Sequence, residues 1–300
     1  MSIPSEMVQD FWDHLDSGSN FFSGREVMKR LHDAQQEILR RIVQEDPSFY
    51  VSTHDLTIVS GTNLYDLPLN ARLGSRIIFT ENTSQTTEIA PADLRAHFHL
   101  SGPGVISLIP GTRFMMQGKQ VRIEPTPSAG ATFRVWYTPS YGNMLEGYVS
   151  AAAAASLSFH TADPNYSTNY GTVDRRDDFY NGMTVRIISG TGVGQERVIT
   201  DYTGSTRLAT VAAWSTTLET SGDNWSKFAV LCPVPEDHHS LVPLRAAMVG
   251  AVKNRNRLND LSMIYHGVPG RPGALFELLG WIMRRQEAGI QTVTPIDSGY

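Results

Sequence analysis

The sequence predicts an α+β fold: a body of N- and C-terminal helices with β-hairpin strands, into which a small all-β module, a barrel or a sandwich, is inserted. Three observations lead to this prediction. Helical periodicity occurs near both ends of the chain, and the segment between residues 57 and 137 alternates as strands do. Residues 156–232 hold several short strands separated by Gly-rich or polar turns.

The clearest predicted helix follows Ser23. Ser23 is a favourable N-cap residue, and Glu26, three residues later, completes a capping box. Pro47 ends the run, and a shorter amphipathic helix is predicted after Pro4. The apolar positions of the longer helix recur on one face: Val27, Leu31, Ala34, Ile38 and Ile42.

A β-hairpin is predicted from two alternating segments joined by a tight turn. Residues 113–116 and 120–123 flank the turn Gly118-Lys119, and a third strand alternates over residues 133–137. The run Ala151 to Ala155 indicates a boundary, either a linker or the start of a strand.

Helix is predicted to return at Pro235 and to continue over residues 241–258, and a last helix covers residues 274–286. The terminal helices flank the β segments, which favours one body with an insertion. The expected organisation is a helical body with strands over 1–149 and 233–287, an inserted β module over 150–232, and a C-terminal tail over 288–300.

Composition sets limits on function. The formal net charge is −5; residues 241–300 carry seven basic and four acidic side chains, so this segment is +3 and the first 240 residues are −8. Such a balance argues against wrapping nucleic acid through a basic surface. The single cysteine excludes an internal disulfide, and neither a signal peptide nor a membrane span is expected. The chain is expected to be made in the host cytoplasm.

No motif predicts an enzyme, a cofactor or a metal. The glycines of residues 190–195 precede a predicted strand, whereas a dinucleotide site needs a helix there, so a β-turn is favoured. His97 and His99, like His238 and His239, lack further ligands close in sequence.

An acidic cluster offers a second possible site. Asp174, Asp177 and Asp178 interleave with Arg175 and Arg176, and local charge compensation is favoured over a metal or acid–base role.

The order of these elements resembles bacteriophage head-to-tail adaptor proteins. The resemblance rests on the capped helix 25–43, the segments 64–68, 121–125 and 135–137, and the helix opened by Pro235-Glu236 over 241–258. Residues 182–188, continuing through Gly192, Gly194-Gln195 and 202–204, resemble a β module inserted in phage virion proteins. Together these segments cover most of residues 20–260.

The resemblance implies a structural protein of the virion neck, between capsid and tail. Such proteins form a ring, here expected to hold twelve copies, between the portal protein and the tail or nozzle protein. Genomic DNA passes through the lumen without sequence-specific binding, and an acidic body would let it slide. The tail, residues 288–300, is expected to order on docking. Partner contacts are expected at Lys253, Arg255, Arg257, Trp281, Ile296 and Tyr300.

Two other functions stay open at the level of sequence. The first is a tail or tail-fibre subunit whose β module binds a glycan or a partner through Trp214 or Trp225. The second is a hydrolase using Asp174, Asp177 or His97, which requires these side chains to converge in one pocket.

Overall fold

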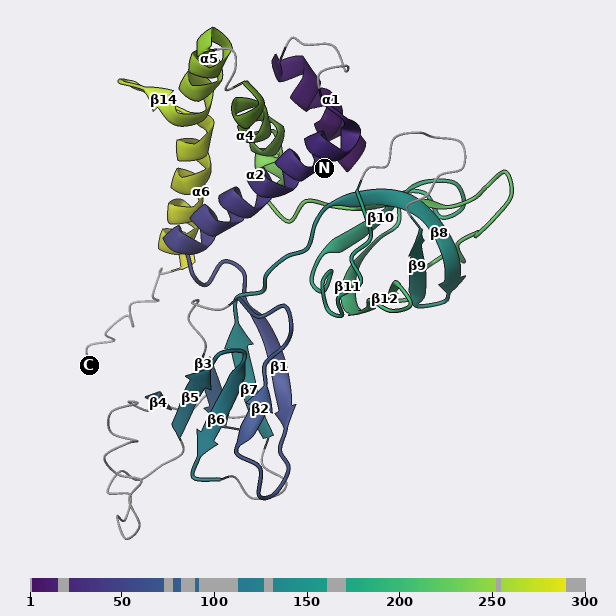
Figure 1. Cartoon of the computed structure of the whole chain (residues 1–300), viewed down its shortest axis with the longest axis vertical. Helices are drawn as coiled ribbons and strands as arrows, with labels where there is room; N and C mark the ends of the chain where they lie inside the picture. The colour runs from purple at the N-terminus through teal and green to yellow at the C-terminus, as the bar shows by residue number, and fades with distance from the viewer. Residues whose placement is uncertain are drawn as a thin grey trace, which may run out of the picture. The chain divides into compact units, whose positions relative to one another are not determined.

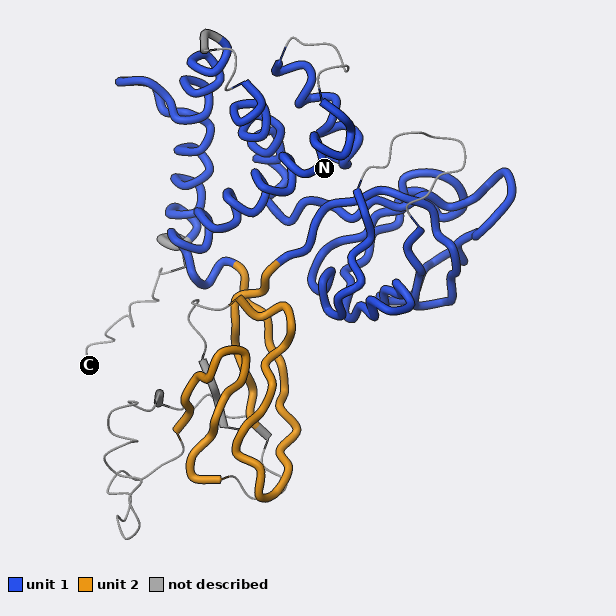
Figure 2. Tube along the Cα trace, viewed as in Figure 1, with its two compact units in different colours: residues 1–49, 141–300 blue, residues 50–140 orange. Residues whose placement is uncertain are grey.

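The computed structural model describes residues 2–15, 22–72, 78–81, 90–91, 113–126, 132–160, 171–251 and 255–289. Helices and sheets are both present, with a closed β-barrel among the latter, which confirms an α+β fold with a β module (Figure 1). The chain divides into two compact units, residues 1–49 together with 141–300, and residues 50–140 (Figure 2).

The helical part of the first unit is built from segments at both ends of the chain. Helices α1 (Pro4–Leu15) and α2 (Gly24–Glu45) come from the N-terminal end. The C-terminal end supplies the 3₁₀ turn η1 (Glu236–His238) and helices α4 (Leu241–Gly250), α5 (Arg255–His266) and α6 (Ala274–Gly289). The packing of these segments joins the two ends of the sequence, as the position of their apolar faces predicts.

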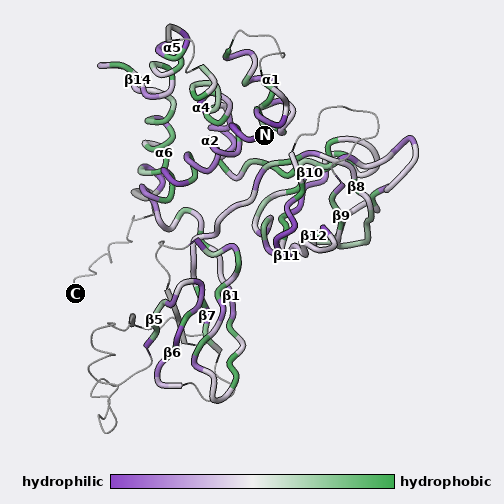
Figure 3. The backbone as a smooth tube through the Cα atoms, viewed as in Figure 1, coloured by the Kyte–Doolittle hydropathy of each residue, from purple (hydrophilic) through white to green (hydrophobic). Residues whose placement is uncertain are grey.

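Helix α2 begins as the sequence predicts. The Ser23 hydroxyl accepts a hydrogen bond from the Glu26 amide, and the Glu26 carboxylate accepts one from the Ser23 amide, so the capping box is confirmed. Figure 3 shows α2 largely in the hydrophilic colour, yet its inner face is apolar and buried. Amphipathicity of this kind places one face in the core and the other in solvent.

Helix α4 is the central helix of this group and packs against α1, α2 and α5. It is mostly apolar and mostly buried, with Arg245 half-buried in an ion pair with Glu37 and Val249 exposed near its end. Its buried residues are Leu241, Val242, Pro243, Leu244, Ala246, Ala247 and Met248. Gly250 lies against α1, because a Cβ at this position would stand 3.3 Å from Leu15 Cδ1 and from Phe11 Cζ.

The continuous helix predicted over residues 241–258 is wrong. Helix α4 ends at Gly250 and α5 starts at Arg255. Glycine has a low helix propensity, and a glycine at this point favours the end of a helix. The apolar residues that suggested this helix, Leu241, Leu244 and Met248, all lie within α4 and are buried there.

The barrel closes in the strand order β10-β11-β12-β9-β8-β13. Its strands, taken along the chain, are β8 (Leu145–Ala153), β9 (Ser156–His160), β10 (Thr184–Ser189), β11 (Glu196–Thr203), β12 (Leu208–Val211) and β13 (Lys227–Val230). Aromatic rings fill the interior, where Phe159 stacks on Tyr202 and Phe228 and meets Tyr180 edge to face. The barrel is therefore a packed core.

The alanine run at Ala151 to Ala155 belongs to the barrel. Its first part ends strand β8, and Ala154-Ala155 form the turn into β9. The run is therefore a hairpin within the β module and does not act as a linker. The predicted limits of that module, 150–232, and of the tail stay predictions.

The second unit, residues 50–140, contains two sheets that share one apolar core. One sheet has the order β1-β7-β3, from β1 (Ser52–Thr57), β7 (Thr132–Tyr137) and β3 (Ile78–Glu81). The other has the order β2-β6-β5-β4, from β2 (Leu64–Asp66), β6 (Gln120–Glu124), β5 (Arg113–Gln117) and β4 (Ala90–Pro91).

The predicted hairpin and the third alternating strand are confirmed within this unit. Strands β5 and β6 pair antiparallel around Gly118, which has a φ of 65°. In β7, Phe133, Val135 and Tyr137 face the core while Trp136 is exposed. A short hairpin of β14 (Gly267–Val268) and β15 (Arg271–Pro272) joins α5 to α6 in the first unit. Among the described residues, no helix is long and apolar enough to cross a membrane.

Candidate functional site

Three polar side chains on one face of α2 hold the extended segment that leads into the barrel. Gln36 Nε2 donates to the Tyr141 carbonyl oxygen at 2.9 Å, and Gln35 Nε2 donates to that of Gly142 at 2.8 Å. The His32 Nε2 lies 2.9 Å from the carbonyl oxygen of Met144. Residues 32, 35 and 36 share one face of the helix by their spacing. Their side chains therefore bind backbone carbonyl groups of this segment, as a neighbouring strand would do with its amides.

The His32 contact fixes the state of its imidazole. A carbonyl oxygen only accepts, so Nε2 carries the proton. Burial is the largest influence and lowers the pKa of His32, while the bond to Met144 and the charge of Asp33 act in the opposite direction. A neutral imidazole committed to a backbone carbonyl positions the chain and is not available as a general base.

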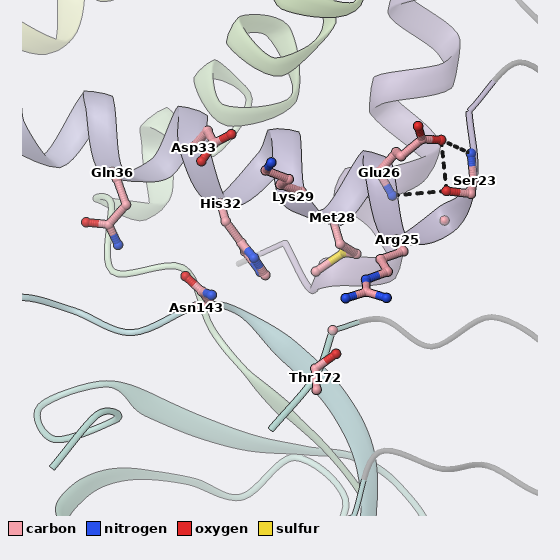
Figure 4. A pocket seen from close by; sticks show the side chains of 12 residues that line it. Ser23, Arg25, Glu26, Met28, Lys29, His32, Asp33, Gln36, Asn143 and Thr172 are labelled. Atoms are coloured by element: carbon pink, nitrogen blue, oxygen red, sulfur yellow. Dashed lines mark hydrogen bonds between the residues drawn. The ribbon is translucent and has the colours of Figure 1, made fainter. Parts of the chain in front are cut away.

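A groove of about 980 Å³ lies between α2 and the segments around Asn143 and Thr172 (Figure 4). Its α2 wall carries basic Arg25 and Lys29 beside acidic Glu26 and Asp33. Mixed charges and amide groups of this kind suit an extended polypeptide, whose backbone needs both donors and acceptors.

The groove contains serine, histidine and aspartate side chains, but their bonds do not form a catalytic relay. The Ser23 hydroxyl donates to the Glu26 carboxylate at 2.8 Å and belongs to the helix cap (Figure 4). His32 is bonded to the Met144 carbonyl. A nucleophile needs a base within hydrogen-bond reach, and here the Ser23 hydroxyl and the His32 imidazole are both bonded to other groups.

The first described residues of the chain are bound to the segment that enters α4. The Ser2 amide donates to His239 Nδ1 at 3.1 Å, and His239 Nε2 donates to the Val234 carbonyl at 2.8 Å. Burial is the main cause that lowers the pKa of His239. This histidine is thus held neutral as a bridge between the N-terminal segment and the chain entering α4.

Glu146 connects α1 to two barrel strands. Its carboxylate accepts a hydrogen bond of 2.6 Å from the Ser5 amide and pairs with Lys227 Nζ at 3.3 Å. The Glu146 side chain is 1% exposed and that of Lys227 is 29% exposed. A buried carboxylate needs such partners, so this cluster ties the start of α1 to β8 and β13.

The acidic cluster at the barrel is explained by local bonds. Asp174 forms a two-point ion pair with Arg176, and the Asp177 carboxylate accepts from the Gly204 amide at 2.7 Å. The side-chain bond to Arg176 is the first cause of the lowered pKa of Asp174. Asp178 accepts from Asn181 at 2.8 Å. These bonds compensate the carboxylates in place.

The glycine-rich segment joins β10 to β11 as a turn. Gly190, Gly192 and Gly194 all have positive φ values, of 77°, 87° and 86°. A Cβ at Gly190 would stand 2.3 Å from the Trp225 carbonyl oxygen, so only glycine fits there. A strand follows this loop, and no helix N-terminus is available to hold a phosphate.

Neither tryptophan proposed for glycan binding presents a free ring. Trp214 is 7% exposed and belongs to the barrel core. Trp225 packs on Tyr148 with ring centres 4.5 Å apart and donates its Nε1–H to the Val149 carbonyl at 2.7 Å. Within the described ranges no group of His, Cys, Asp and Glu could hold a metal; His97 and His99 lie outside them.

The residues expected to contact partners fall into two groups. Arg257 donates from Nε to the His14 carbonyl at 2.6 Å, joining α5 to α1, and Trp281 packs edge-on against Phe49 and His238. The other four are not described in full: Lys253, Ile296 and Tyr300 lie outside the described residues, as does the side chain of Arg255. Their role as partner contacts stays a prediction.

The N-terminal part of the sequence is similar to a known protein family. Residues 5–147 match the family model described as SU10 adaptor protein, slightly less than half of the 300 residues. The matched stretch covers α1, α2, the whole unit 50–140 and the start of β8, and it is consistent with a phage adaptor. No curated protein matches the sequence.

Proposed function

We propose that this chain is a structural, non-enzymatic virion protein that forms a ring at the virion neck and joins the portal to the tail. The observation that carries the proposal is the match of residues 5–147 to the SU10 adaptor protein family. That stretch contains four of the segments on which the sequence resemblance to head-to-tail adaptors rests, residues 25–43, 64–68, 121–125 and 135–137; the helix over 241–258 and the β module lie outside it.

The hydrogen bonds of α2 favour a structural role for this site, in which its side chains hold the polypeptide backbone in place. His32, Gln35 and Gln36 are all engaged with backbone carbonyl groups of residues 141–144. In the adaptor ring, the α2 groove would receive an extended segment of a neighbouring protein, portal or tail, through its mixed charges.

The charge distribution suits a ring with DNA in its lumen. The first 240 residues carry a formal charge of −8, and acidic surfaces repel the phosphate backbone. DNA would pass through such a ring without being held, whereas a basic lumen would bind it and slow its exit. The ring would hold twelve copies, as the resemblance implies.

The alternative, a tail or tail-fibre subunit with a glycan-binding β module, finds less support. The buried ring of Trp214 and the engaged indole of Trp225 leave neither residue as a stacking platform for a sugar.

Deletion of the gene from the phage genome tests the proposal. Loss of a head-to-tail adaptor leaves filled or leaking heads and complete tails that do not join, and the purified protein added to the lysate restores joined particles. Complete particles assembled without the chain would contradict the proposal. Joined virions that fail only to adsorb to cells would support the tail-fibre alternative.

A further inference from the structure

Helix α1 lies at one edge of the helical group and is attached to it by a small apolar contact (Figure 1). Its buried residues are Pro4, Met7 and Phe11, and the Phe11 ring lies against Gly250 of α4. A peripheral helix with few buried side chains separates from its neighbours at a lower free energy than a central helix does. The polar contacts of α1 therefore contribute a large share to its docking.

The first of these polar contacts lies at the N-terminal end of α1. The imidazole of His239, a residue that is 3% exposed, accepts a hydrogen bond from the Ser2 amide at Nδ1 and donates one to the Val234 carbonyl from Nε2. Only the neutral imidazole can do both, because it has one acceptor nitrogen and one donor nitrogen. Protonation would turn Nδ1 into a second donor facing the amide N–H, so the bond to Ser2 would be lost.

A second histidine lies at the C-terminal end of α1. Arg257 of α5 donates from Nε to the His14 carbonyl oxygen at 2.6 Å, which holds the guanidinium close to this turn. Burial is the largest influence on the pKa of His14 and lowers it; Arg257 lowers it further, while Asp10 and Asp13 of α1 raise it. A protonated His14 would therefore stand half-buried near a second cation as long as α1 is docked.

The charged groups around His239 come from two other segments. Burial is the largest influence and lowers the pKa of His239, and the amino-terminal charge lowers it further. Glu236 of η1 and the carbonyl groups of Val234 and Cys232 raise it, without reversing the effect of burial. Both histidines are thus neutral at neutral pH when α1 is docked.

We propose that α1 is an arm released by acid, in which protonation of His239 and His14 frees the segment Ser2–Leu15 from α4. At the barrel, Glu146, paired with Lys227, accepts a hydrogen bond from the start of α1. Release makes the apolar faces of both α1 and α4 available for another contact. The inference goes beyond the proposed function and does not depend on the ring.

The sign of the effect follows from the two lowered pKa values. A group whose pKa is lowered in the docked state stabilises docking above its pKa in the released state, and this contribution is lost as the pH falls through the docked pKa. Over that range, the ratio of released to docked α1 rises by up to about tenfold per pH unit for each histidine. Release should therefore begin below about pH 6.5, the ordinary pKa of histidine.

Hydrogen exchange followed by mass spectrometry tests the release on the full chain at about pH 7.5 and about pH 5.5, with rates corrected for the chemical effect of pH. At the lower pH, peptides from α1 should lose at least about threefold more protection than peptides from α4 and α5. The variant H14Q/H239Q should abolish this difference. Glutamine at position 239 can accept from Ser2 and donate to Val234, and glutamine does not titrate near neutral pH.

The matched control is H266Q, which removes an exposed histidine of α5 and should leave the release of α1 as in the parent. Thermal unfolding at the higher pH identifies the folded variants, and the single variants H14Q and H239Q should each show a smaller release if the double variant does not fold.

Three outcomes would overturn the proposal. The first is equal loss of protection in α1, α4 and α5, which would show acid unfolding of the whole helical group. The second is protection of α1 that is unchanged between the two pH values. The third is a release that persists undiminished in the folded histidine variants.

Discussion

Gln35 on α2 donates a hydrogen bond of 2.8 Å from Nε2 to the carbonyl oxygen of Gly142, and the Gln35 side chain is fully buried. The contact joins residues 107 positions apart in the sequence. On the same helix face, His32 binds the carbonyl group of Met144 and Gln36 binds that of Tyr141. One helix face thus fixes the chain where it enters the barrel.

Replacing Gln35 with alanine should lower the free energy of unfolding by about 1–3 kcal/mol, because the buried Gly142 carbonyl would lose its partner. Urea unfolding followed by circular dichroism measures this change. Gln44→Ala on the exposed face of the same helix is the matched control and should change stability little. Equal effects of the two substitutions would show that the Gln35 bond does not stabilise the fold.

Replacing Lys227 with methionine should destabilise the chain more than replacing Glu146 with glutamine. The first change leaves a carboxylate that is 1% exposed without its ion-pair partner, at a cost of about 3–5 kcal/mol. The second leaves a lysine that is 29% exposed and can be hydrated, and glutamine still accepts from the Ser5 amide. Combining both should recover part of the loss, and a double-mutant cycle in urea measures the coupling. Strictly additive costs would contradict the pairing.

The unfolding free energy should fall as the pH drops below about 6.5. Burial lowers the pKa values of His32 and His239 below the ordinary 6.5, so the unfolded chain binds more protons than the folded chain in this range. The contribution is fully present above the unfolded pKa and is lost as the pH falls through the folded pKa. Unfolding curves between pH 7.5 and pH 5, taken at about 0.5 unit steps, measure the slope.

The variant His32→Gln should flatten this dependence, since glutamine can donate to Met144 but does not titrate near neutral pH. His266→Gln, at an exposed position, is the matched control for the loss of an imidazole. A slope unchanged by His32→Gln would contradict the assignment of His32 to the pH dependence.

Cys232 should not react in the folded protein. Burial raises the pKa of this thiol to about 12, so the reactive thiolate is scarce as well as inaccessible. A thiol-reactive chromophore should give no signal with the native chain and one equivalent after denaturation, since the chain has one cysteine. Rapid labelling of the native chain would show that the segment preceding α4 opens.

Local signals predicted several elements correctly. The Ser23–Glu26 capping box and the turn at Gly118 depend on a few adjacent residues, which sequence displays directly. The pairing of Asp174 with Arg176 was likewise predictable from neighbouring opposite charges, whereas the bond from the Gly204 amide to Asp177 was not.

Features that depend on distant partners were missed. Strands β8 and β9 contain alanines and serines of low strand propensity, and they form because neighbouring strands complete the barrel. Gln35 lies on the apolar face of α2, four residues after Leu31 and three before Ile38, and a polar residue there was the available signal. Its partner Gly142 cannot be identified from periodicity.

Negative-stain electron microscopy of the purified chain mixed with the portal protein of the same genome tests the central claim most directly. The proposed function predicts a closed ring of this chain seated coaxially on the portal, with an open central channel. A chain that leaves the portal bare at the highest soluble concentration, or that forms an elongated trimeric particle, would contradict it.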